Sequence, residues 1–279
     1  MKIAILSDIH NINERRTYES LESFHFYDLD KKTRESLKDV DVFVFAGDIS
    51  TCPEGYDYWT KKFVNEITSL DNADFDLLSI RGNHDYYSEE NPYMHLYDFL
   101  IGKCKSCPQR INSDKVLFRR DNVSFIGTTL WSPPQNERCF NLTDFHYIDW
   151  FNEKRNGDKN NIFKVYKREK NWLIRTVKKE KKEFPNNKIV VFTHHAPISE
   201  LIPDDYKNCD TSFLNSCFAN VVQEDNEKFK NLPVDLWIYG HTHENKDITI
   251  NNIRFVSNQR GYESEYELYY NFKPLIIEL

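Results

Sequence analysis

The chain contains short, mostly apolar runs of strand length, and each run ends abruptly in polar or turn-forming residues. The clearest of them are residues 2–6, 40–46, 77–80, 188–193 and 234–239. Apolar runs of about four to eight residues bounded by turn signals are typical of strands buried in a sheet. Shorter runs predict further strands at residues 116–118, 123–127, 247–250, 253–256 and 274–277, and the first two of these predict a hairpin.

Between these runs, apolar residues recur every three or four positions. Residues 56–70 show this spacing, with Trp59, Phe63 and Ile67 among the apolar positions, which predicts an amphipathic helix. The same reasoning predicts helices over residues 92–101, 163–184 and 217–232. The loop 198–216 is longer than packing usually needs, so it is a candidate lid.

The polar residues that follow the main strands are of the kinds that bind metal ions. In chain order they are Asp8 and His10, Asp48, Asn83, His194, and His241 with His243. Because the carboxyl ends of neighbouring parallel strands meet at one edge of a sheet, we expect these side chains to converge there. Most of the nine histidines lie in these motifs or directly beside them, and this concentration favours a metal site over scattered surface residues.

The chemistry of this ligand set narrows the choice of metal. Imidazole, carboxylate and amide groups without a thiolate suit Mn, Fe, Zn or Co, and they argue against a structural cysteine-type zinc centre. The set is too large for one tetrahedral ion, but it suits two ions that share a carboxylate. Two such ions, roughly 3.5 to 4 Å apart, can clamp the oxygens of an in-line phosphoryl displacement.

Composition sets further limits. The chain has 279 residues and a formal net charge of −7, so no large nucleic-acid surface is implied. The first residues hold too short an apolar run for a signal peptide, and no stretch reaches the roughly 18 apolar residues that would span a membrane. We therefore expect one soluble, cytoplasmic domain over residues 1–279. Cys104 and Cys107 have the spacing of a metal or redox pair, but no second pair completes a zinc site.

Taken together, the motifs resemble those of the calcineurin-like metallophosphoesterase superfamily. They run from Asp8-Ile9-His10 through Gly47-Asp48, Gly82-Asn83-His84-Asp85 and His194-His195-Ala196-Pro197 to Gly240-His241-Thr242-His243. Residues 127–132 and 257–262 also resemble segments of a bacterial, largely uncharacterised branch. The resemblance implies a four-layer α/β/β/α sandwich with two central mixed β-sheets and a di-metal site at the carboxyl ends of their strands.

The resemblance also implies a role for each motif residue. Asp8, His10 and His243 would bind one metal, Asn83, His194 and His241 would bind the other, and Asp48 would bridge the two. A hydroxide held between the metals would be the nucleophile. His84, which is not a ligand in the family, would stabilise developing charge or protonate the leaving oxygen.

Four neighbouring residues have more than one reading. Asp85 could orient the ring of His84 or cap the next turn. Arg260 could pair with phosphate oxygens in bidentate fashion, or it could be a surface arginine in a turn. His195 could pack near the metals, or it could replace His194 as the ligand. Trp131 could stack on a substrate or close the core.

The sequence thus predicts a metal-dependent hydrolase of phosphomonoesters or phosphodiesters, acting on a phosphorylated small molecule or a nucleotide. Ile49-Ser50-Thr51 replaces the Asp-Arg-Gly of the protein phosphatase branch, which disfavours phosphoprotein substrates. No membrane or protein partner is implied. The alternatives are a non-catalytic scaffold on the same fold, and a nuclease acting on single strands. We expect the substrate pocket to be walled by residues 131–149 and 198–216.

Overall fold

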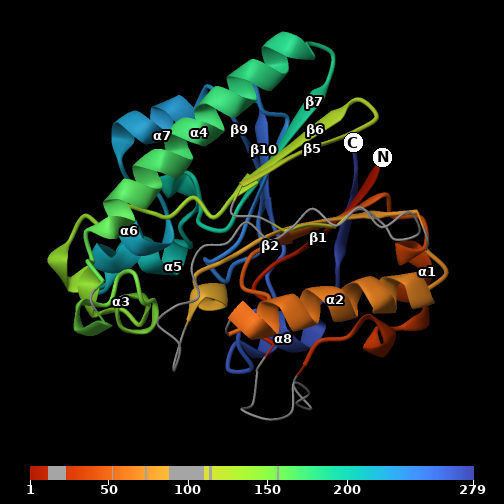
Figure 1. Cartoon of the computed structure of the whole chain (residues 1–279), viewed down its shortest axis with the longest axis horizontal. Helices are drawn as coiled ribbons and strands as arrows, with labels where there is room; N and C mark the ends of the chain where they lie inside the picture. Colours follow the sequence, from red (N-terminus) through yellow and green to blue (C-terminus); the bar gives the residue numbers. More distant parts are fainter. Residues whose placement is uncertain (12–22, 52, 73, 88–109, 113–114, 156) are drawn as a thin grey trace.

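The computed structural model describes residues 1–11, 23–51, 53–72, 74–87, 110–112, 115–155 and 157–279. Two mixed β-sheets pack face to face, and helices cover the outer face of each (Figure 1). The structure therefore confirms the four-layer sandwich expected from the motifs. In the described part of the chain, no helix combines the length and apolar character needed to cross a membrane.

The first sheet has the strand order β11-β1-β2-β3-β4. Its strands are β1 (Lys2–Leu6), β2 (Val42–Ala46), β3 (Asp76–Ile80), β4 (Arg110–Asn112) and β11 (Leu275–Glu278). Strands β1 to β4 are parallel to one another, and β11 pairs antiparallel with β1. Its outer face is covered by helices that lie in the lower half of Figure 1, namely α1 (Lys31–Leu37), α2 (Pro53–Ser69) and α8 (Tyr266–Asn271).

The second sheet has the order β5-β6-β7-β8-β10-β9. Its strands are β5 (Lys115–Arg120), β6 (Val123–Thr128), β7 (Lys188–Thr193), β8 (Leu236–Tyr239), β9 (Asp247–Ile250) and β10 (Ile253–Ser257). Strands β6, β7, β8 and β10 are parallel, while β5 and β9 are antiparallel edge strands. Its outer helices are α4 (Asn161–Glu183) and α7 (Gln223–Lys230).

Side-chain alternation along the strands explains the layering. In β1, Ile3 and Ile5 join the apolar core between the two sheets, whereas Ala4 and Leu6 join the core beneath α2. A third core, which includes Val177 of α4, fills the space between the second sheet and its helices. Because successive side chains of a strand point to opposite faces, strands that are apolar throughout become buried on both sides.

The remaining short elements lie in the connections between the strands and the longer helices. They are the 3-10 helices η1 (Phe26–Asp28), η2 (His84–Tyr86), η3 (Glu137–Asn141), η4 (Glu153–Arg155), η5 (Ser199–Leu201) and η6 (Ser212–Leu214), and the α-helices α3 (Asp144–Tyr147), α5 (Asp204–Lys207) and α6 (Asn215–Phe218). The predicted loop 198–216 is therefore built largely from short helices.

One predicted helix is partly wrong. Residues 217–232 do not form a continuous helix, because α6 ends at Phe218 and α7 begins only at Gln223. Between them Ala219 is extended and forms a bridge with Ala196, and the Asn220 N–H donates to the carbonyl of Ala196 at 2.9 Å. This tertiary pairing overrides the local helical pattern. The predicted helix 92–101 and the pair Cys104 and Cys107 lie outside the described residues.

Candidate metal centre

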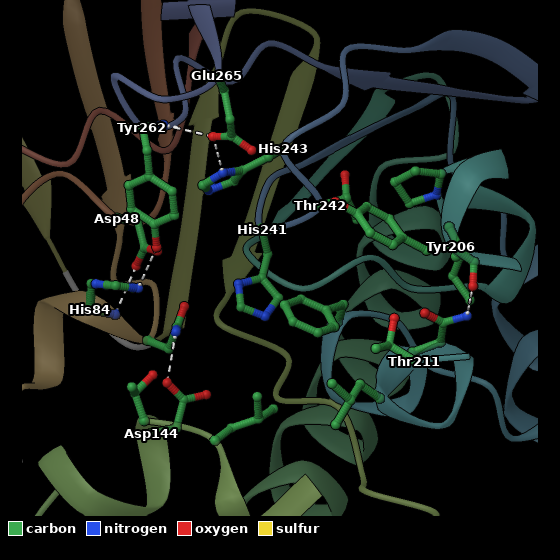
Figure 2. A pocket seen from close by; sticks show the side chains of 18 of the residues that line it. Asp48, His84, Asp144, Tyr206, Thr211, His241, Thr242, His243, Tyr262 and Glu265 are labelled. Carbon is green, nitrogen blue, oxygen red and sulfur yellow. Dashed lines mark hydrogen bonds and ion pairs between the residues drawn. The ribbon is translucent and has the colours of Figure 1, made fainter. Parts of the chain in front are cut away.

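The strand order brings all the predicted metal-binding loops to one edge of the sandwich. Strands β1, β2 and β3 are parallel neighbours in the first sheet, and β7 and β8 are parallel neighbours in the second. The loops after these five strands carry the seven predicted ligands. Figure 2 shows Asp48, His241 and His243 facing a common cavity, with His84 beside Asp48.

Asp8, His10 and His243 form what we call the first half-site. Nε2 of His10 lies 3.1 Å from Nε2 of His243, which in turn lies 3.4 Å from Oδ1 of Asp8. One potential ligand atom from each of the three lies within 4.8 Å of the others. Two imidazole nitrogens facing each other beside a carboxylate form a donor set that fits a shared divalent cation.

Asn83, His194 and His241 form the second half-site. The Oδ1 atom of Asn83 lies 2.9 Å from Nε2 of His194, and ligand atoms of Asp48, His194 and His241 lie within 4.8 Å of one another. The Oδ2 atom of Asp48 is 3.4 Å from Nε2 of His194 and 3.8 Å from Nε2 of His10. The carboxylate of Asp48 therefore lies between the half-sites, where a bridging ligand belongs.

The backbone of these loops is unusual. Five of the seven predicted ligands have a positive φ angle: Asp8 (52°), His10 (48°), Asp48 (53°), His241 (70°) and His243 (48°). Such angles are uncommon for residues other than glycine, and they persist only where the surrounding structure imposes them. Here two backbone hydrogen bonds join the loop after β1 to the loop after β2. The Asp8 N–H donates to the carbonyl of Gly47, and the His10 N–H donates to the carbonyl of Asp48. The sequence carries no signal of this conformation.

Two motif glycines allow the loops to approach closely. A Cβ at Gly47, whose φ is +94°, would lie 2.5 Å from Nδ1 of His194. A Cβ at Gly82 would collide with the side chain of Asp48. Because glycine has no side chain, the loops after β2, β3 and β7 can approach one another closely at the candidate metal centre.

Hydrogen bonds fix Nδ1 of two of the predicted ligand histidines. Nδ1 of His194 donates to the carbonyl of Ala46 at 2.9 Å, and Nδ1 of His243 donates to the carboxylate of Glu265 at 2.6 Å. Burial opposes charge on His243, but Asp8 and Glu265 outweigh it and raise its pKa to about 10. Each bond directs Nε2 toward the centre, as outer partners of metal ligands commonly do.

The amide of Asn83 is oriented by a second carboxylate. Its Nδ2 donates to Oδ1 of Asp144 at 2.8 Å, and the hydroxyl of Tyr87 donates to the same oxygen at 2.6 Å. With Nδ2 bound in this way, Oδ1 of Asn83 faces Nε2 of His194, 2.9 Å away. Sequence reasoning missed both Asp144 and Glu265, since neither lies in a recognisable motif.

The predicted histidine ligands differ in the direction in which the site shifts their pKa. Burial opposes ionisation of Asp48, but His194 and His84 hold the pKa of this carboxyl well below its usual range. Burial also opposes charge on His194, yet Asp48 raises its pKa to about 9. By contrast, burial and neighbouring histidines lower the pKa of His10 and His241 well below the ordinary value. The last two rings are therefore neutral, which is the form that binds a metal.

His84 lies at the edge of the centre, between two tyrosines. Its Nε2 is 3.0 Å from the hydroxyl of Tyr262, and its ring centroid is 4.4 Å from that of Tyr87. The backbone N–H of His84 donates to Oδ1 of Asp48 at 2.9 Å. The ring thus faces the cavity close to the bridging carboxylate (Figure 2).

The hydrogen bonds of Asp85 go to the backbone of residues that precede it, rather than to the ring of His84 or to the turn that follows. Its carboxylate is fully buried and accepts hydrogen bonds from the backbone N–H groups of Gly82 and Ser50, both at 2.8 Å. Burial, with a contribution from Asp48, raises its pKa to about 7. Asp85 therefore ties the loop after β3 to the loop after β2.

Arg260 is not among the described residues that line the cavity, so its pairing with phosphate stays a prediction, and its burial contradicts the alternative of a surface arginine in a turn. It is buried, its Nη1 donates to the carbonyl of Ile9 at 3.0 Å, and its guanidinium lies 3.9 Å from the ring centroid of Tyr269. These contacts place its charge behind the loop that carries Asp8 and His10. A buried arginine that binds a backbone carbonyl and an aromatic face supports the loop from below.

His195 and Trp131 pack beneath the site. Nδ1 of His195 lies 3.2 Å from Oγ of Ser132, and its ring is 4.2 Å from that of His241. Trp131 is buried and meets Phe151 edge to face. Packing is therefore the role that the structure supports for both residues.

A cavity of about 380 Å³ opens next to the half-sites. Its lining includes Asp48, Asn83, His84, His241 and His243, together with residues 142–144 and residues between 202 and 218. These last two stretches fall in or close to the walls predicted from the sequence.

Comparison with known proteins supports the fold and the family. The family model of calcineurin-like phosphoesterases matches residues 1–245. An uncharacterised protein of Acanthamoeba polyphaga mimivirus is 30% identical over 252 residues, which cover 86% of this chain and 84% of the viral protein.

Two solved structures are similar to this chain, and the first of them supports the shared fold. A phosphopantetheinyl hydrolase of Mycobacterium tuberculosis has a TM-score of 0.56 at 11% identity, covering 98% of this chain and 95% of its own. A dimetal phosphatase of Danio rerio has a TM-score of 0.49 at 13% identity, covering 92% of this chain and 87% of its own. At such identities the likeness concerns the fold alone. With the family model matching most of its length, the chain belongs to the calcineurin-like phosphoesterase family.

Proposed function

We propose that this chain is a di-metal phosphoesterase that hydrolyses phosphate monoesters or diesters of small molecules or nucleotides. The observation that carries the proposal is the placement of Asp48 between two half-sites of matched chemistry, with His84 beside it. Two bound metals would lower the pKa of a water molecule and neutralise charge on the phosphoryl group. The ligand set suits Mn or Fe, and Zn is also compatible with it.

In this proposal the protein's own residues hold the reactants and move a proton. The ligands are Asp8, His10 and His243 in the first half-site, Asn83, His194 and His241 in the second, and Asp48 in both. His84 would donate a proton from Nε2 to the leaving oxygen, or donate a hydrogen bond to a phosphoryl oxygen. The hydroxyl of Tyr262, 3.0 Å from that nitrogen, would keep the ring turned toward the cavity.

Three observations favour catalysis over a scaffold. Every ligand position of the family pattern is filled, and the ring of His84 is held at the cavity although the pattern does not use it as a ligand. A scaffold gains nothing from strained backbone at five ligand positions, because such conformations cost stability. A cavity of about 380 Å³ also favours a small substrate over a nucleic-acid strand.

We further propose that residues 1–279 form one domain. The support is the pairing of β11, near the end of the chain, with β1 at its start. Strand β11, which follows the family motifs, therefore belongs to the same sheet as β1, and β1 leads into the loop that carries Asp8 and His10.

The proposal is tested with protein stripped of metal and reloaded with Mn, assayed on a chromogenic phosphate monoester and the matching diester. We expect turnover of at least one ester that depends on two bound metals per chain, measured by elemental analysis. Preference between the esters would identify the substrate as monoester or diester. No turnover of either ester, with two metals bound, would contradict the proposal and favour the scaffold.

A further inference from the structure

The cavity has two unlike sides. One side holds the half-sites, His84 and Tyr262, and the other holds Tyr206 and Thr211, with His241 between them (Figure 2). The lining also includes five apolar residues, Leu142, Ile202, Pro203, Leu214 and Phe218, which we call the apolar wall.

The apolar wall is continuous with the second half-site. The ring of Phe218 stacks on the ligand His241 with centroids 5.0 Å apart and an interplanar angle of 27°. Ile202 belongs to the core of the second sheet and is 6% exposed, which anchors the wall. A phosphoryl group at the metals would therefore place its organic substituent within reach of these side chains.

Apart from the histidines of the metal side, the ionisable side chains that distinguish the lining are carboxylates. Asp48, Asp144 and Glu265 face the cavity, and the described residues that line it include neither lysine nor arginine. The last two carboxylates are already hydrogen-bonded to ligands of the metals. A second anionic group on the substrate would meet apolar side chains or like charge there, and burying it unpaired is costly.

We infer that this site selects phosphate esters whose organic group is uncharged and apolar, such as an aryl group, over esters whose organic group carries a further negative charge. The inference rests on the proposed phosphoesterase function and names its substrate class. A cavity of about 380 Å³ is at the lower end of the range for small-molecule sites, so the organic group is small.

The test compares phenyl phosphate with 3-carboxyphenyl phosphate on the metal-loaded protein. The two esters have leaving groups of similar acidity and differ by one carboxylate, so the difference in kcat/KM reports the environment of the organic group. If diesters are preferred, the corresponding diaryl esters replace them. We expect kcat/KM to be higher for phenyl phosphate by roughly tenfold or more.

Lysine substitutions in the lining test whether these side chains cause the preference for phenyl phosphate. Leu214→Lys puts a cation into the partly buried wall, and Thr211→Lys does so at an exposed position of the lining, where folding is not at risk. Both are expected to reduce the preference for phenyl phosphate roughly tenfold, by pairing with the carboxylate. Leu117→Lys, on the 42% exposed Leu117 of β5 outside the lining, is the matched control and leaves the preference unchanged.

The outcomes separate the two proposals. A preference for phenyl phosphate that falls in both Leu214→Lys and Thr211→Lys supports the inference. Equal kcat/KM for the two esters, or a preference that Thr211→Lys does not change, overturns the inference but leaves the phosphoesterase intact. No hydrolysis of any ester with two metals bound overturns the proposed function, and the inference with it.

Discussion

The two half-sites use similar ligands but differ in how they are held. In the first, the side chain of His243 is 14% exposed and depends on Glu265, itself 32% exposed. In the second, His194 is fully buried and donates to the backbone of β2, while Asn83 is 3% exposed. One histidine is therefore oriented by a single partly exposed side chain, and the other by the sheet itself.

This difference indicates which half-site is positioned by the backbone of a central strand and which depends on a surface side chain. The carbonyl of Ala46 belongs to a central strand, so the orientation of His194 is fixed whenever the sheet forms. Glu265 comes from the segment after β10, and its carboxylate also accepts the N–H of Tyr262. We therefore expect the first half-site to be the more easily perturbed by mutation, and the second to be the more robust.

The largest effect is expected where the half-sites share a residue. Asp48→Asn removes the charge that lies between them, so we expect both metals to bind poorly and the rate to fall by at least about 10³-fold. Metal content and turnover are measured on the same sample. Asp39→Asn, whose side chain is 76% exposed, is the control. Retention of one metal at full affinity would mean that Asp48 serves a single half-site.

The next effect concerns catalysis without metal loss. His84→Ala removes the proposed proton donor, so we expect a rate reduced by roughly 10² to 10⁴-fold with both metals retained. Elemental analysis and steady-state kinetics separate these quantities. His146→Ala, an exposed position of α3, should behave as wild type. If His84→Ala loses a metal, then His84 is a ligand and the division into half-sites is wrong.

A matched pair of substitutions tests the comparison directly. Glu265→Gln weakens the hold on His243 and should lower the affinity of one metal by roughly 10 to 100-fold. Asp144→Asn does the same to Asn83 and should affect the other metal, less strongly because Tyr87 shares that oxygen. Stepwise titration of the metal-free protein by calorimetry resolves the two affinities. Equal weakening of both metals by both variants would show that the half-sites are not independent.

The smallest effect is expected at Tyr262. Removal of its hydroxyl in Tyr262→Phe leaves the ring in place and removes one hydrogen bond to His84, of the order of 0.5 to 1.5 kcal/mol. We expect turnover to fall a few-fold, metal binding to be unchanged, and the loss to disappear in the His84→Ala background. Tyr266→Phe, at a 70% exposed position, is the control. An equal loss in both backgrounds would assign Tyr262 a role independent of His84.

The convergence of the proposed ligands could be predicted because these residues directly follow apolar strands. Asp48 and His194 are each two residues or fewer beyond the strand that carries them, so strand pattern and residue type together placed them. Glu265 and Asp144 could not be found this way, since their partners are distant in sequence and their contacts exist only in the folded chain. The burial of Arg260 and its contact with Tyr269 could not be predicted either, because they arise only in the folded chain.

The positive φ angles of the ligand loops have a consequence for stability. A glycine adopts such angles without steric cost, whereas Asp8, His10, Asp48, His241 and His243 each adopt them at some expense. Replacing His243 by glycine should thus relieve the backbone of the metal-free protein even as it destroys the first half-site. Selection for thermal stability alone would then favour glycine at these five positions and act against the proposed metal centre.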